Sequence, residues 1–232
     1  MVYESEMQVS PGVRIKFQRT APTYWGTHYV LCLHAPTGSV TEDFTHLIET
    51  FDKDKFTLVA CELLWDSDIQ LSNGQEWLKE NVKRLAEHAV TLMQRLFYTP
   101  FSIVAHGDAG LVAFHLALQY PTFVTSLVLW QCTLNVRKEH LIRLKYDYDK
   151  QSDSKLRKML ARIIEDYQNH FDTQTDLSDM KKILSLDHPA LYVTAGRDDP
   201  AKSGEQARYL NHYLPSLRFP RLATNNLTHR IW

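Results

Sequence analysis

The chain has 232 residues, of which 44% are hydrophobic and 23% charged, and its formal net charge is −1. This composition is typical of a globular domain with a sizeable core, and the near-neutral charge argues against binding to nucleic acid or to an anionic membrane. The N-terminus carries Glu4 and Glu6 where a signal peptide would be basic and then apolar, and no apolar run is long enough to span a bilayer. We therefore expect a cytoplasmic protein.

The predicted elements alternate between strands and helices along the chain. In chain order, the pattern predicts a strand at 13–19, a buried strand at 28–34, a helix at 42–51 capped by Thr41, a strand at 56–64, a helix at 75–97, a strand at 101–105, a helix at 110–120, and strands at 124–130 and 190–194. Buried strands that alternate with amphipathic helices predict an α/β fold with a mostly parallel sheet flanked by helices. Without repeats or linker-like tracts, residues 1–232 are expected to form a single domain.

Residues 134–187 interrupt this alternation because they are poor in strands. Within them, Asp153 is expected to cap a helix whose apolar face includes Met159, Ile163 and Tyr167. A helical insertion between two strands is typical of a lid over a site, and its length favours that interpretation over an ordinary crossover connection.

The segment from 100 to 132 is the most informative part of the chain. It reads PFSIVAHGDAGLVAFHLALQYPTFVTSLVLWQC, a strand followed by a small-residue turn and a helix. This segment resembles the nucleophile elbow, G-x-S-x-G, of the α/β-hydrolase superfamily. It is similar to the G-W-S-D-G-G elbow of the valacyclovir-hydrolase-like (biphenyl-hydrolase-like) branch. His34 and Gly38 resemble the H-G-x-x-G loop of that branch, and residues 196–200 resemble its G-x-x-D-P acid loop.

The resemblance implies a Ser-His-Asp triad, but most of the matching positions carry other residues. Gly107 stands at the nucleophile position and Asn225 at that of the general base, and neither side chain supports the chemistry. Pro36 stands where a backbone N–H completes the oxyanion hole, and proline has no N–H. Asp199 alone matches, and a triad acid orients nothing without its histidine. No catalytic residue is therefore expected, and Gly107, Asp199 and Asn225 are predicted to be vestigial triad positions.

Two alternatives remain at this site. A displaced base at His229 with a nucleophile at Asp108 would give an esterase or amidase with a rearranged site, although Asp108 lies one residue late in the elbow. A single inactivating substitution would explain Gly107 but neither Asn225 nor Pro36.

The residues expected around the old pocket are His34, Pro36, His106, Asp108 and His229. We interpret His34 and His106 as structural histidines, and we expect His46, His88, His115 and His212 to lie on helices at the surface or the edge of the core. Cys32, Cys61 and Cys132 lie in strand-like runs and are expected to be buried free thiols. No metal-ligand spacing or cofactor motif is present in the sequence.

The expected function is binding rather than catalysis. The chain stops at Trp232, before the helix that usually closes this fold. This predicts that a face of the sheet is left uncovered by the chain itself and is covered by a protein partner or by a second copy in a homodimer. The alternative is a truncated chain. A small-molecule ligand is the second possibility, with Trp65, Tyr146 and Tyr148 lining the old pocket. The sequence names neither partner nor ligand.

Overall fold

The computed structural model describes residues 2–21, 27–71, 76–132, 138–169 and 190–193. Within these ranges the strands form one sheet in the order β1-β2-β4-β3-β5-β6-β7. Strands β3 to β7 pair in parallel, whereas β1 and β2 form an antiparallel hairpin at one edge. The predicted mostly parallel sheet is therefore confirmed. The strands are β1 (Val2–Ser10), β2 (Val13–Thr20), β3 (His28–Leu33), β4 (Phe56–Cys61), β5 (Phe101–His106), β6 (Val124–Trp130) and β7 (Ala190–Val193).

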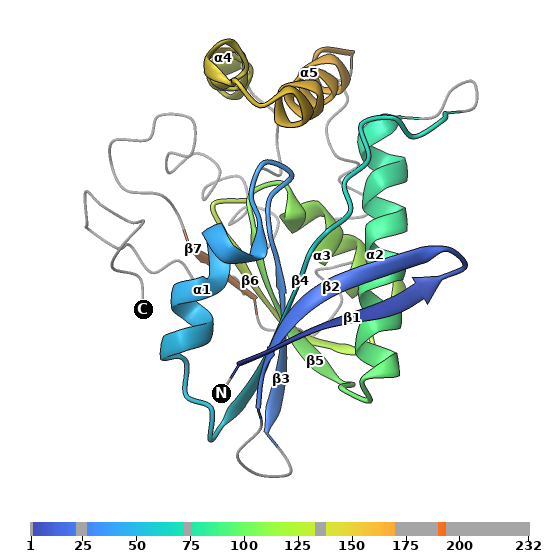
Figure 1. Cartoon of the computed structure of the whole chain (residues 1–232), viewed down its shortest axis with the longest axis vertical. Helices are drawn as coiled ribbons and strands as arrows, with labels where there is room; N and C mark the ends of the chain where they lie inside the picture. The colour runs from blue at the N-terminus through green and yellow to red at the C-terminus, as the bar shows by residue number, and fades with distance from the viewer. Residues whose placement is uncertain (1, 22–26, 72–75, 133–137, 170–189, 194–232) are drawn as a thin grey trace.

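Helices cover both faces of the sheet. Helix α1 (Val40–Thr50) lies on one face, and α2 (Trp77–Arg95) and α3 (Ala109–Gln119) lie on the other (Figure 1). Alternate residues of β3 divide between the two sides: Val30 and Cys32 pack in the cluster that contains α1, whereas Leu31 and Leu33 pack in the larger cluster under α2 and α3. Both faces of the central strands are thus removed from water, which is why their sequences are almost continuously apolar.

The thiols of Cys32, Cys61 and Cys132 are free and buried, as the sequence predicts. Burial, with a smaller contribution from the charge of Glu62, raises the pKa of Cys61 to about 12. Burial also raises the pKa of Cys32, and the neighbouring Cys61 raises it further. Cys32 and Cys61 therefore remain protonated and act as small apolar core residues.

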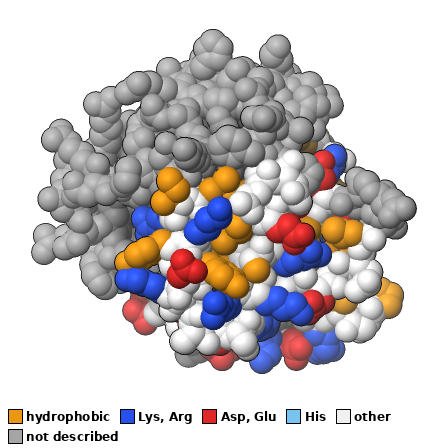
Figure 2. All heavy atoms as spheres, turned by 90° about the horizontal axis from the view of Figure 1, so that it is seen from above, with side chains coloured by type: hydrophobic (Ala, Val, Ile, Leu, Met, Phe, Trp, Pro, Cys, Tyr) orange, Lys and Arg blue, Asp and Glu red, His pale blue; other side chains and the backbone are white. Residues whose placement is uncertain are grey.

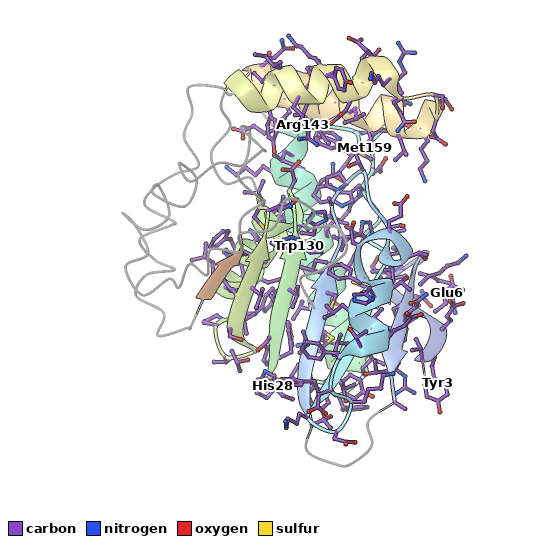
Figure 3. All side chains as sticks on the ribbon, turned by 90° about the vertical axis from the view of Figure 1, so that its left-hand side faces the viewer. Tyr3, Glu6, His28, Trp130, Arg143 and Met159 are labelled. Carbon is purple, nitrogen blue, oxygen red and sulfur yellow. The ribbon has the colours of Figure 1, made fainter. Side chains whose placement is uncertain are left out.

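The helical insertion lies between β6 and β7. In its described part, it consists of α4 (Lys138–Lys150) and α5 (Ser154–Asn169), which lie together above the sheet in Figure 1. Figure 3 places them at the end of the sheet where Trp130 closes β6, opposite the end where His28 begins β3. The insertion therefore covers the carboxyl ends of the parallel strands, where ligands bind in open α/β sheets. Within the described ranges, none of the helices is both long and apolar enough to cross a membrane.

Several predicted boundaries need correction. Helix α1 begins at Val40, and its cap is Ser39 rather than Thr41, because the Ser39 side chain accepts the N–H of Glu42. Strand β4 ends at Cys61 instead of continuing to Leu64, because the chain turns there and the Trp65 N–H bonds to the Leu63 carbonyl. The cap at Asp153 is confirmed, since its Oδ1 accepts two N–H groups of the first turn of α5 at 2.9 Å. Strand β1 and helix α4 are not among the predicted elements.

Candidate functional site at the turn between β5 and α3

Gly107 forms the sharp turn between β5 and α3. Its φ is +59°, in the left-handed region, which glycine adopts without steric cost. The Gly107 N–H donates to the Trp130 carbonyl at 3.0 Å, and its carbonyl accepts the Gly110 N–H at 3.1 Å. The turn is therefore fixed on one side by β6 and on the other by the first turn of α3, which is the geometry of a nucleophile elbow.

The space next to Gly107 is occupied by Ala35. Strands β3 and β5 are parallel neighbours with Leu33 opposite Ala105, so the residues that follow them, Ala35 and Gly107, also lie side by side. A Cβ atom at Gly107 would lie 3.0 Å from the Ala35 Cβ, which is closer than carbon atoms normally approach. A residue with a side chain at position 107 would thus adopt a disfavoured backbone conformation and would be crowded by the Ala35 methyl group.

The loop between β3 and α1 closes around the carboxylate of Asp43. Asp43 Oδ2 accepts the Ala35 N–H at 3.2 Å, and the Gly38 N–H donates to the Ala35 carbonyl at 3.0 Å. The next residue, Pro36, is buried and has no N–H. The Ala35 N–H is therefore already bound by a carboxylate, and Pro36 has no N–H. Neither residue can donate a hydrogen bond to a developing oxyanion.

His34 is held within this loop. Its Nε2 accepts the Leu63 N–H at 2.8 Å, and its Nδ1 lies 2.7 Å from the Ala35 carbonyl, which places the proton on Nδ1. Glu62 Oε2 also lies 3.2 Å from Nε2. With only 3% of its surface exposed, His34 has the contacts of a structural histidine.

His106 lies next to Gly107 but is paired with Asp43. Its Nδ1 is 2.9 Å from Asp43 Oδ2, an ion-pair distance, although the direction does not satisfy hydrogen-bond geometry. Its ring stacks on Trp130 with centroids 4.5 Å apart, and its Nε2 lies 3.5 Å from the Gln131 side chain. Asp43 could not be identified from the sequence, because its role depends on a contact between α1 and the end of β5 that no local pattern records.

Asp108, which follows Gly107, lies beside Tyr167 of the insertion. Tyr167 is buried, and burial first, then the charge of Asp108 and a hydrogen-bonding contact with it, raise the pKa of Tyr167 well above its ordinary value. Among the described residues, the buried hydroxyl has no hydrogen-bond partner that meets the usual geometric limits. From the sequence, Tyr167 was expected only as part of the apolar face of its helix.

The remaining predicted site residues have mixed outcomes. Asp199, Asn225 and His229 lie outside the described residues, as does the segment that follows β7. Trp65 is 7% exposed and belongs to the larger core cluster, whereas Tyr146 is 55% exposed on α4 and does not line a buried site. On the helices, His46 is exposed and His115 is half-buried, as expected, while His88 is 8% exposed and lies deeper than the surface or core edge. His212 lies outside the described residues.

Comparisons with known proteins show which proteins the chain resembles. No family model matches the chain. The serine hydrolase BPHL of Mus musculus is 29% identical over 131 residues, which is 55% of this chain and 43% of the relative, and that of Homo sapiens matches over the same shares. The matched region thus spans less than half the length of the curated relatives.

Solved structures match nearly the whole chain. The 2-hydroxy-6-oxo-6-phenylhexa-2,4-dienoate hydrolase BphD of Rhodococcus sp. strain RHA1 is 15% identical, with a TM-score of 0.77 over 96% of this chain and 90% of that one. A putative lipase of Acinetobacter baumannii is 16% identical, with a TM-score of 0.65 over 95% and 82%. The strand order and the turn between β5 and α3 are those of the α/β-hydrolase fold, which these solved structures share. Over the matched region the chain is similar to the serine hydrolase BPHL.

Proposed function

We propose that this protein is a non-catalytic member of the superfamily, a pseudoenzyme that acts by binding. The observation that carries the proposal is the pair formed by Gly107 and Ala35: the elbow has no nucleophile, and a Cβ in its place would lie 3.0 Å from the Ala35 methyl. Two features add support. The Ala35 N–H is bound by Asp43, and Pro36 has no N–H to donate.

A protein partner is the favoured ligand, because the apolar face of α5 is already buried. On α5, Met159, Ile163 and Tyr167 are each less than 5% exposed and belong to the larger core cluster. With these side chains buried, the outer surface of the insertion is the part left to bind a partner. That partner is either a different protein or a second copy of this chain.

Helix α4 of the insertion offers exposed apolar side chains to such a partner. Ile142 is 61% exposed and Tyr146 is 55% exposed on α4. Seen from above, the described part of the surface carries scattered apolar side chains among Lys, Arg, Asp and Glu. Positively and negatively charged side chains are intermixed there (Figure 2). Such a mixed surface is ordinary for a transient protein interface.

Two experiments test the absence of catalysis: labelling of the wild-type protein, and restoration of activity by substitution. Wild-type protein is expected not to react with a fluorophosphonate probe, and Gly107→Ser is expected to stay unreactive because base and oxyanion donors are also missing. Ala35→Gly with Gly107→Ser is the sharper variant, since it removes the methyl next to the new side chain. Stoichiometric labelling of wild-type protein at one residue would overturn the proposal, as would activity of the double variant at the level of a serine hydrolase.

A further inference from the structure

The outward face of helix α4 is complementary to a second copy of itself. We propose that two copies of this protein associate through this face, with the two α4 helices antiparallel and Tyr146 next to the two-fold axis. The inference rests on the proposed function and deepens it, because it identifies the partner of the surface that α4 offers.

The apolar part of this face lies opposite the side of α4 that packs on α5. Among the described elements, α5 is the main neighbour of α4, and Leu141, Leu144 and Tyr148 are half-buried. Ile142 and Tyr146, by contrast, are 61% and 55% exposed. With 3.6 residues per turn, these two side chains lie one above the other on the far side of the helix from the half-buried ones. The stripe is therefore directed away from the rest of the described chain.

Charged side chains flank the stripe in the same order on both sides. Arg143 precedes Asp147 by one turn on one flank, and Lys145 precedes Asp149 by one turn on the other. When two such helices pack antiparallel around Tyr146, each flank faces its own reversed copy. Arg143 then lies opposite Asp147 of the second copy, and Lys145 lies opposite Asp149 of the second copy, each within about 1.5 Å of register along the axis.

The same charges oppose a parallel arrangement of the two helices. In a parallel pair, each flank would face the other one, so Arg143 would meet Lys145 of the second copy. Asp147 would likewise meet Asp149 of the second copy. Like charges placed against each other suppress a wrong arrangement, and the antiparallel pair is thereby selected.

Pairing within the helix does not account for this pattern. In both pairs the basic residue precedes the acidic one, which is the less favourable order for intrahelical pairs four residues apart. Arg143 Nε and Asp147 Oδ2 lie 3.8 Å apart, near the limit of an ion pair. Among the described residues, neither Lys145 nor Asp149 has an ion-pair partner, and both side chains are exposed. Both charges of this flank are therefore available to a second copy.

An exchange of charges tests this arrangement. Wild-type protein is expected to dimerise in sedimentation velocity with a dissociation constant of about 10–100 µM, because one helix pair buries less than the roughly 1,600 Å² of a standard interface. Lys145→Glu and Asp149→Lys should each weaken the homodimer roughly tenfold, since each places like charges opposite one another at two symmetric positions. Mixed one-to-one, the two variants should form a heterodimer about as tight as the wild-type dimer, because every pair on this flank is again opposite in charge.

The mixture separates association between copies from effects within one chain. Neither variant restores an opposite-charge pair inside its own helix, so recovery on mixing requires contact between copies. Lys83→Glu is the matched control, because this exposed lysine lies on α2 and its substitution changes the net charge equally. It should leave the wild-type dimer unchanged.

Three results would overturn the inference. They are a wild-type protein that stays monomeric up to about 500 µM, a dimer that persists when Ile142→Ser and Tyr146→Ser are combined, and a mixture of the charge variants that associates no better than either alone. A monomer without ester turnover would leave the proposed function in place, with a different protein as partner. A dimer with ester turnover would overturn the proposed function and keep this interface.

Discussion

At position 107, backbone conformation and packing oppose any side chain. Gly107→Ala is expected to cost ~1–2 kcal/mol for the left-handed backbone and about 1 kcal/mol or more for crowding against Ala35. Urea unfolding should therefore show a loss of roughly 2–4 kcal/mol. In a double-mutant cycle, Ala35→Gly should recover the crowding part, with a coupling energy of ~0.5–2 kcal/mol.

Gly12 provides a matched control for this measurement. Its φ is +75°, but a Cβ there would meet nothing within 4 Å, so Gly12→Ala tests the backbone effect alone. Its cost should stay near ~1–2 kcal/mol and should not couple to Ala35. Equal costs at both glycines would show that Ala35 does not obstruct position 107.

His88 gives the fold a dependence on pH. Burial, followed by the charge of Arg84, lowers the pKa of His88 below its ordinary value, so the folded protein keeps this imidazole neutral. The unfolded chain takes up the proton at about pH 6.5. As pH falls through that value toward the lowered pKa, the unfolded state binds more protons and stability declines. Tm should therefore fall between about pH 7 and pH 5, and less so in His88→Gln.

His46 serves as the comparison for this effect, because its side chain is exposed on α1. His46→Gln should leave the slope of Tm against pH as it is in wild-type protein. If His88→Gln and His46→Gln change that slope equally, the burial of His88 is not the cause.

Helix α5 is held mainly by its apolar face. Ile163 is 1% exposed, and Ile163→Ala should cost about 2–5 kcal/mol. The ion pair between Lys158 and Asp68 has side chains 55% and 66% exposed, so Lys158→Ala should cost at most ~1 kcal/mol. Denaturant unfolding of the two variants measures both values, and a larger loss for Lys158→Ala would show that the ion pair is the main attachment.

Elements with a strong local pattern were predictable from the sequence. Strand β6 was expected at 124–130 and lies there, because this short run is rich in apolar and β-branched residues, which favour a strand. Strand β1 was missed because most of its side chains are exposed, although Pro11 and Gly12 mark a turn between two alternating segments. Helix α4 was missed for a similar reason, since its described side chains are mostly exposed and give a weak apolar stripe.

The candidate site was predictable only where it follows from the elbow motif. The motif located Gly107 at the turn between strand and helix, because this turn is local in the sequence. The pair between Asp43 and His106 and the contact between Tyr167 and Asp108 join distant segments. They depend on the strand order and on how α1 and α5 pack, which no single-sequence pattern specifies.

The whole molecule has an α/β-hydrolase fold, with β5, the turn at Gly107 and α3 in place. Gly107 has no side chain at the nucleophile position, and a Cβ there would lie 3.0 Å from the Ala35 Cβ. Fold and activity are separable because chemistry resides in a few side chains on the scaffold.

The most direct test is turnover of activated esters by the wild-type protein. Hydrolysis of p-nitrophenyl acetate and butyrate should match that of a heat-denatured control at the same concentration, and intact-mass spectrometry should detect no acylated chain. Saturable turnover above the control, with an acyl group mapped to one residue, would contradict the account.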